Sequence, residues 1–112
     1  MKEPRALTKR AQYTLVYQQG EVWASSLVVM KAAPNSLCLS RYGFSVTKKV
    51  GKAVQRNHLK RLLRETMRLR SLKPGWDIVF IARSVAVNAD YHRLERTVTE
   101  LLARAQLLES NE

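Results

Sequence analysis

Cysteine is almost absent from this sequence of 112 residues, since Cys38 is its only example. A single cysteine excludes an intrachain disulfide, and nothing in the sequence favours an oxidising compartment. The composition therefore indicates the reducing cytoplasm. No second thiol or nearby histidine accompanies Cys38, so we expect it to be a small apolar residue inside a strand.

Long apolar runs and acidic clusters are also missing. No stretch approaches the about 20 apolar residues of a membrane-spanning helix, and the N-terminal region lacks the apolar centre of a signal peptide. The only histidines are His58 and His92, and the predicted helices contain no carboxylate pair at helical spacing among the nine acidic residues of the chain. No group of side chains therefore suits a zinc site or metal-dependent phosphodiester cleavage by the protein itself.

Positive charge is abundant and concentrated in one segment. Twenty Lys and Arg face nine Asp and Glu, which gives a net charge of +11 and a pI near 10.4. Between residues 48 and 73, ten Lys and Arg face only Glu65. This excess is larger than the solubility of a small domain requires, so we expect a polyanionic partner.

Periodicity and turn residues predict six elements in one domain spanning residues 1–112. Thr8 is the expected cap of the first helix and Asn88 that of the last, while Pro34 and Pro74 mark turns. The order α-β-β-α-β-α indicates an α+β fold built as a two-layer sandwich. The expected ranges are a helix at 8–20, strands at 22–32 and 38–48, a helix at 51–70, a strand at 76–83 and a helix at 88–108.

Alternation and helical spacing predict which faces of these elements are buried. In the strand at 38–48, the inward set is expected to be Cys38, Tyr42, Phe44 and Val46, and the outward set Arg41, Ser45 and Thr47. In the last helix, the expected core stripe is Leu94, Val98, Leu101, Ala105 and Leu108.

The helix expected at 51–70 separates leucines from cations on a helical wheel. Its cationic sector holds Asn57, Lys60, Arg61, Arg64 and Arg68, and the opposite side holds Leu59, Leu62, Leu63 and Leu69.

A charge run is usually a solvated face, but such faces mix signs. Here Arg56 to Lys60, Lys60 to Arg64 and Arg64 to Arg68 are all like-charge steps of four residues, which destabilise an isolated helix. Phosphates would neutralise them. A membrane surface is the alternative polyanion, but these leucines are needed for the core. The pattern therefore favours a nucleic acid.

A second candidate surface lies on the first helix. Lys9, Tyr13 and Tyr17 follow at i, i+4 and i+8, with Val16 beside them. Such a stripe is often core, but aromatic faces beside cations also hold unpaired bases without demanding a sequence. The outward residues of the strand at 38–48 are candidates for the opposite wall.

The run "RYGFSVTKKVGKAVQRNHLKRLLRE" closely resembles the signature of the bacterial ribonuclease P protein subunit, whose helix carries Arg-Asn-Arg followed by Lys-Arg. The stretches "QYTLVYQQG" and "WDIVFIAR" also fall where that family has matching elements, so the resemblance covers nearly the whole chain. It implies a cofactor protein for a catalytic RNA that removes the 5′ leader of precursor tRNA with Mg²⁺ bound mainly by the RNA. It also implies a left-handed βαβ crossover, as in a related ribosomal protein domain.

The resemblance further implies two groups of site residues. Those expected at the catalytic RNA are Lys52, Arg56, Asn57, His58, Lys60, Arg61, Arg64 and Arg68. Those expected at the single-stranded leader are Lys9, Tyr13, Tyr17, Arg41 and Ser45.

The sequence departs from the family pattern in two ways. His58 replaces the second Arg of Arg-Asn-Arg, so a permanent cation becomes a group that is mostly neutral at pH 7. Tyr13 and Tyr17 stand where the family usually has Phe, which keeps a stacking face and adds a hydroxyl. Two alternatives stay open: a ribosomal or other structural RNA-binding protein, and an autonomous nuclease, which would need an acidic cluster.

Overall fold

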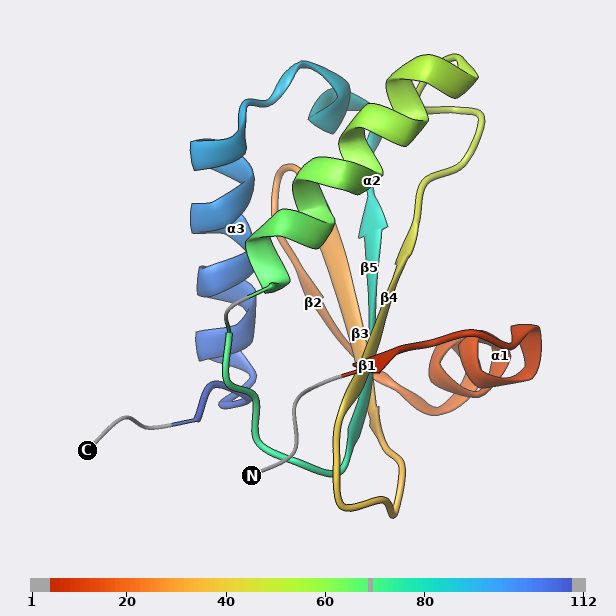
Figure 1. The fold of residues 1–112 in the computed structure, drawn as a ribbon, viewed down its shortest axis with the longest axis vertical. Coiled ribbons are helices and arrows are strands. Elements are labelled where there is room, and N and C mark those ends of the chain that lie inside the picture. Colours follow the sequence, from red (N-terminus) through yellow and green to blue (C-terminus); the bar gives the residue numbers. More distant parts are fainter. Residues whose placement is uncertain (1–4, 69, 110–112) are drawn as a thin grey trace.

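The computed structural model describes residues 5–68 and 70–109. Strands and helices alternate irregularly along this part of the chain (Figure 1). In chain order the elements are β1 (Arg5–Ala6), α1 (Arg10–Gln19), β2 (Glu21–Ala24), β3 (Val28–Pro34), β4 (Arg41–Ser45), α2 (Ala53–Met67), β5 (Trp76–Ala82), the 3₁₀ helix η1 (Ser84–Asn88) and α3 (Tyr91–Arg104).

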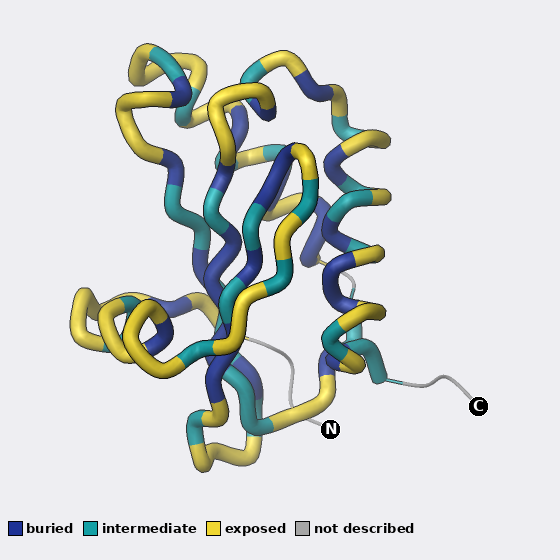
Figure 2. The backbone as a smooth tube through the Cα atoms, turned by 180° about the vertical axis from the view of Figure 1, so that it is seen from behind, coloured by how far each residue is buried: buried dark blue, intermediate teal, exposed yellow. Residues whose placement is uncertain are grey.

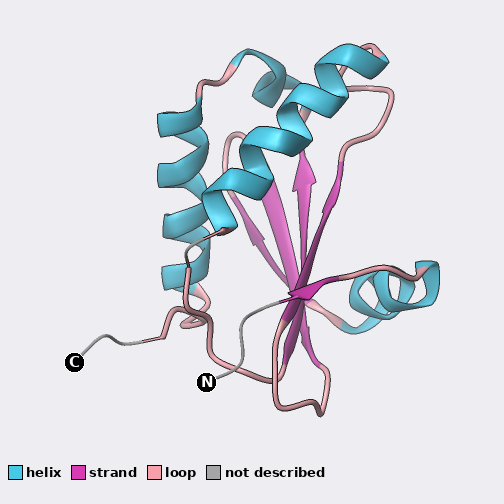
Figure 3. Ribbon diagram, in the orientation of Figure 1, coloured by secondary structure: helices cyan, strands magenta, loops and turns pink. Residues whose placement is uncertain are grey.

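One five-stranded sheet, in the order β1-β4-β5-β3-β2, organises the fold (Figure 3). The strand β4 runs parallel to both of its neighbours, whereas β3 is antiparallel to β5 and to β2. The helices α2 and α3 cover one face, and α1 packs against a small part of the other. The α+β class is confirmed; the left-handed form of the β4–α2–β5 crossover stays a prediction.

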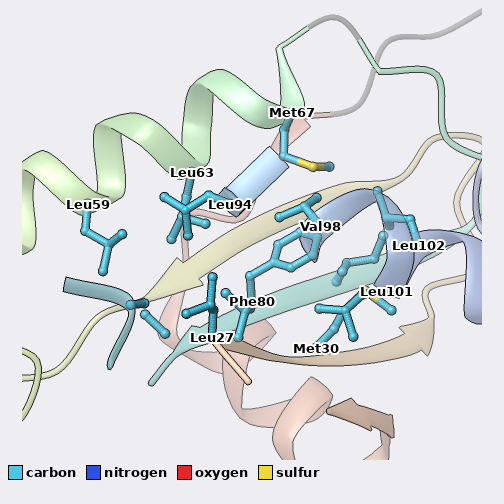
Figure 4. Close-up of a cluster of buried hydrophobic side chains, with 14 of the residues drawn as sticks. Leu27, Met30, Leu59, Leu63, Met67, Phe80, Leu94, Val98, Leu101 and Leu102 are labelled. Atoms are coloured by element: carbon cyan, nitrogen blue, oxygen red, sulfur yellow. The ribbon is translucent and has the colours of Figure 1, made fainter. Parts of the chain in front are cut away.

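The main core lies between the sheet and the pair α2 and α3 (Figure 4). Leu59 and Leu63 of α2 point into it, opposite Phe80 of the central strand β5. The preceding residue of β5, Val79, faces α1 instead and is also fully buried. Both faces of β5 are therefore covered, which explains why its sequence is almost continuously apolar.

The stripe expected on the last helix is confirmed at Leu94, Val98 and Leu101, all of which are fully buried. Figure 2 shows the alternation of buried and exposed turns along α3. The helix ends at Arg104, however, and the predicted continuation to Leu108 is wrong. Leu108 instead forms an isolated bridge with Leu72, beyond the left-handed Gln106.

The caps of two helices differ from the expectation. Asp90, rather than Asn88, caps α3, because its Oδ1 accepts a hydrogen bond from the Arg93 backbone N at 2.9 Å. At α1, Thr8 lies before the cap residue Lys9. The Gln12 side chain accepts from the backbone N of Thr8 at 2.9 Å and of Lys9 at 3.0 Å. The Gln12 side chain thus reaches back to the two amides that precede the helix, and the expected cap by the Thr8 side chain is not formed.

The prediction of a single strand at 22–32 is wrong, since the chain turns back between β2 and β3. Ser25 makes this turn: its Oγ donates to the Val28 carbonyl at 2.7 Å and accepts from the Val28 N at 3.1 Å. The two-residue strand β1 was also missed, because two residues show no periodicity.

Cys38 is exposed in the loop before β4, so its expected place inside a strand is wrong. The inward positions Tyr42, Phe44 and Val46 do pack against the core as expected. The helix α2 is shorter than the expected 51–70, and Leu69 lies outside the described residues. None of the described helices is long and apolar enough to cross a membrane.

Candidate nucleic-acid interface

The helix α2 presents most of its polar residues to solvent. Leu59 and Leu63 are buried, and Leu62 is partly buried against the same core. The amphipathic character expected of this helix is therefore confirmed. Its exposed polar residues include Asn57, His58, Arg61 and Arg64, and Lys52 and Arg68 are exposed directly before and after the helix, while Arg56 and Lys60 are half-buried.

Few of these cations are neutralised by the protein. Glu65 pairs with Arg68 at 3.2 Å, and both side chains are largely exposed, so this pair contributes little to stability. Within the described residues, Lys52, Lys60, Arg61 and Arg64 form no ion pair. The exposed side of α2 thus carries an uncompensated positive charge, as the like-charge steps along the sequence indicated.

Arg56 differs from the other members of this group. Its Nε is buried and has no hydrogen-bond partner among the described residues. Because that N–H is not at the surface, only the terminal nitrogens of the guanidinium are available to a partner molecule. Arg56 therefore lies at the inner margin of the cationic side.

The helix α1 places Tyr17 at the surface, Val16 in the core and Tyr13 half-buried between the two. The ring centroids of Tyr13 and Tyr17 lie 6.5 Å apart at an angle of 47°. Between them, Val16 is buried against Val79 and Leu7. The stripe is thus core at Val16 and surface at Tyr17, and Lys9 is exposed at the start of the helix.

Three residues that are neighbours across the sheet lie beneath α1. Gly43, Val79 and Lys31 are paired in register on β4, β5 and β3. A Cβ atom at Gly43 would collide with the Tyr13 hydroxyl, so glycine allows this ring to approach the strand. At the other end, the Lys31 Nζ lies 5.8 Å from the Tyr17 ring centroid and donates to the Tyr17 carbonyl at 3.3 Å. Tyr13, Tyr17 and the cation Lys31 together form a surface that we call the aromatic strip.

A second register row runs alongside α1 and remains half-exposed. It consists of Ser45, Ile81 and Val29 on β4, β5 and β3. Ser45 thus lies two residues along β4 from Gly43, on the same face of the sheet, and its expected role at the leader stays a prediction. Ile81, Val29 and the cation Lys31 were missed, because only the strand register brings them next to Ser45.

Arg41 is held by the protein itself. Its Nε and Nη2 donate to the Asp77 carboxylate at 2.8 and 2.6 Å, and Asn35 donates to the same carboxylate at 2.9 Å. Asp77 is 6% exposed, and the hydrogen bonds that Arg41 donates to its carboxylate raise the pKa of Arg41. The interpretation of Arg41 as a free cation for the leader is therefore weakened, since its charge is matched by a buried carboxylate.

A pocket of about 220 Å³ joins the two candidate surfaces beside β4, at the point where the short edge strand β1 ends. Its wall includes Tyr13 from the aromatic strip and Lys60 and Arg64 from α2. Tyr42 and Gly43 of β4 complete the side toward the sheet.

The two tyrosines of this pocket are protonated donors at neutral pH. Burial raises the pKa of Tyr13, and Tyr17 raises it further, while a hydrogen bond with the Phe44 backbone acts in the opposite direction. Burial also raises the pKa of Tyr42, against the influence of Arg64. The pocket thus combines aromatic faces, hydroxyl groups and cations, which together suit a nucleotide.

Comparisons with known proteins identify the family of the chain. The family model described as Ribonuclease P matches residues 1–106 of the chain. A ribonuclease P protein component from Dehalococcoides mccartyi is 53% identical over 108 residues, covering 96% of this chain and 90% of that protein. The protein of the same name from Caldanaerobacter subterraneus subsp. tengcongensis is 42% identical over 108 residues, covering 95% and 93%.

Two solved structures are similar over most of their length. The RNase P protein from Thermotoga maritima has a TM-score of 0.81 at 30% identity, covering 94% of this chain and 98% of that chain. The RNase P protein from Staphylococcus aureus has a TM-score of 0.83 at 28% identity, covering 93% and 97%.

Proposed function

The chain belongs to the ribonuclease P protein family, and from this membership we propose that it is the RNA-binding protein subunit of a ribonuclease P. In this role it binds a catalytic RNA and the 5′ leader of precursor tRNA, and it assists removal of the leader. The observation that carries the proposal is the uncompensated positive charge on the exposed side of α2. A solvated helix has no need of such a surface, whereas a phosphate backbone neutralises it.

The catalytic RNA is the proposed partner of this side of α2. Leu59 and Leu63 fix the helix on the core, so its cations are presented in a set orientation. Arg61 is exposed and without an ion pair among the described residues, which makes it the clearest candidate for a phosphate contact. His58 is also exposed and can donate a hydrogen bond, but it lacks the permanent charge and the two-pronged grip of arginine.

The leader is the proposed partner of the strip formed by Tyr13, Tyr17 and Lys31. Aromatic rings beside a cation bind unpaired bases with little sequence preference, which suits leaders of differing sequence. The half-exposed row of Ser45, Ile81 and Val29 supplies a floor beside the strip. Arg41 contributes to this site by holding β4 in place rather than by meeting the RNA.

The cleavage chemistry is proposed to belong to the RNA. Among the described residues, no group of three His, Cys, Asp or Glu side chains is placed to hold a metal ion. We therefore propose that the Mg²⁺ ions needed for phosphodiester hydrolysis are held mainly by the RNA. Such bound ions would activate the water molecule that attacks the phosphodiester. The protein's own contribution is to bind and orient the two RNAs, in the cytoplasm.

Reconstitution tests this proposal. Purified protein is added to precursor tRNA at low Mg²⁺, with and without the catalytic RNA, and release of the leader is followed on a gel. We expect no cleavage by the protein alone, slow cleavage by the RNA alone, and strong stimulation when both are present. Cleavage without the RNA would show that the protein is itself a nuclease, and absence of stimulation would favour a structural RNA-binding role.

A further inference from the structure

The pocket at the edge of β4 lies between two surfaces that the sequence assigned to different RNAs. Tyr13 belongs to the strip proposed for the leader, whereas Lys60 and Arg64 belong to the helix proposed for the catalytic RNA. All three side chains nevertheless line one pocket of about 220 Å³. One molecule that enters this pocket must therefore meet both surfaces.

The size and walls of the pocket restrict what fits. Its volume is below the range of about 300 to 1,000 Å³ that drug-sized ligands occupy, so it suits one ring system rather than a larger group. Tyr13 and Tyr42 offer aromatic faces and hydroxyl groups to such a ring. The absence of a side chain at Gly43 keeps the wall open where the Tyr13 hydroxyl approaches it.

The cations at the pocket differ from those farther round α2. Lys60 and Arg64 line the pocket, whereas Arg61, which lies on the same turns of α2, and Arg68, directly after the helix, do not. At 100° per residue, Arg61 points about 60° beyond Arg64, away from the pocket. The helix thus carries two cationic edges, one toward the strip on α1 and one toward open solvent.

We propose that this pocket receives one nucleotide of the unpaired leader, with its base against Tyr13 and Tyr42 and its phosphates at Lys60 and Arg64. The inference rests on the proposed function and refines it, because it moves two cations of α2 from the catalytic RNA to the substrate. The leader then passes from the cationic helix, through the pocket, to the strip of Tyr17 and Lys31. The open-solvent edge at Arg61 is left for the catalytic RNA.

Binding measurements on the holoenzyme test this division of the helix. Lys60→Gln and Arg64→Gln are compared with Arg61→Gln, a matched change on the same helix outside the pocket. Each holoenzyme is assembled at saturating protein and titrated with precursor tRNA and with mature tRNA. We expect Lys60→Gln and Arg64→Gln to weaken precursor binding by roughly tenfold relative to mature tRNA, which is about 1.4 kcal/mol. Arg61→Gln should leave this ratio unchanged and weaken assembly with the catalytic RNA.

The contrary result is equally clear. If Lys60→Gln and Arg64→Gln leave the ratio of precursor to mature binding unchanged, as Arg61→Gln does, the pocket does not hold the leader. The proposed function would still stand, because stimulation of the RNA by the unaltered protein measures it independently.

A second measurement leaves the protein unaltered. Single abasic nucleotides are placed at successive positions of the leader, and binding of each precursor to the holoenzyme is measured. A base pocket predicts a loss of about tenfold concentrated at a position between the cleavage site and the nucleotides that meet Tyr17. A flat profile over those positions would show that the pocket holds no base.

Discussion

Replacement of Asp77 by Asn should destabilise the fold through loss of its ion pair with Arg41. The Asp77 carboxylate accepts two hydrogen bonds from the guanidinium, at 2.8 and 2.6 Å, and one from Asn35 at 2.9 Å. An amide in its place turns an N–H group toward donors and leaves the guanidinium without a counter-charge. Breaking a buried ion pair costs about 3 to 5 kcal/mol.

The exposure of the two partners sets the expected value within that range. The side chain of Asp77 is 8% exposed and that of Arg41 is 23% exposed, so water replaces part of what Arg41 loses. We therefore expect a loss near the lower limit, about 3 kcal/mol of the free energy of unfolding. For a domain of this size that is a fall in Tm of roughly 12 °C, and a large part of a total stability of about 5 to 15 kcal/mol.

Urea denaturation of Asp77→Asn, Arg41→Met and the double variant measures the interaction as a double-mutant cycle. We expect a coupling energy of about 2 kcal/mol with unchanged m-values. Additive single effects, with coupling below about 0.5 kcal/mol, would refute the reasoning that the pair is a linked structural unit. In the folded Arg41→Met protein, the salt dependence of precursor binding should match that of the unaltered protein, since Asp77 already neutralises this cation.

Three further changes have defined outcomes. Leu63→Ala should cost about 3 to 5 kcal/mol in urea denaturation, because Leu63 is 0% exposed, whereas Leu15→Ala at a position 51% exposed should change stability by less than about 0.5 kcal/mol. Because the pKa of Tyr13 is raised in the folded protein, the stability that its neutral hydroxyl contributes is complete below the ordinary pKa of 10 and is lost as the pH rises through the folded pKa. The Tyr13→Phe variant should therefore lose less stability above pH 10 than the unaltered protein, and the same fall in both proteins would contradict this. Tyr17→Ala should weaken binding of precursor tRNA by about 1 to 3 kcal/mol relative to mature tRNA, and equal losses for both would show that Tyr17 does not contact the leader.

Some features of the fold were evident from short-range patterns. The leucines and cations of α2 separate on the helix because its period is fixed, and the same holds for Leu94, Val98 and Leu101 of α3. The turn at Ser25 was not evident, because the apolar residues on both sides of it continue as if they formed one strand. Its cause is a pair of side-chain hydrogen bonds to Val28, which only the folded hairpin makes visible.

The predictions of the helix caps and of a buried Cys38 were wrong for a related reason. Thr8 and Asn88 are both good cap residues, but the described helices use Gln12 and Asp90 to satisfy their first amides. Competing polar side chains a few residues apart differ by too little energy for sequence alone to choose between them. Cys38 was predicted to be buried because the alternation of β4 was extended to residues before Arg41, but the strand begins only at Arg41.

The sequence by itself determined the excess of positive charge, its concentration between residues 48 and 73, and the amphipathic character of α2, because these depend on composition and on a local period. Only the tertiary structure decided which charges remain free. Arg41 and Asp77 are 36 residues apart, and the parallel register of β4 and β5 brings them together. The same sheet brings Tyr13 to Gly43 and closes one pocket with Arg64. Strand register depends on the burial of whole faces rather than on neighbouring residues, which is why these contacts could not be found along the chain.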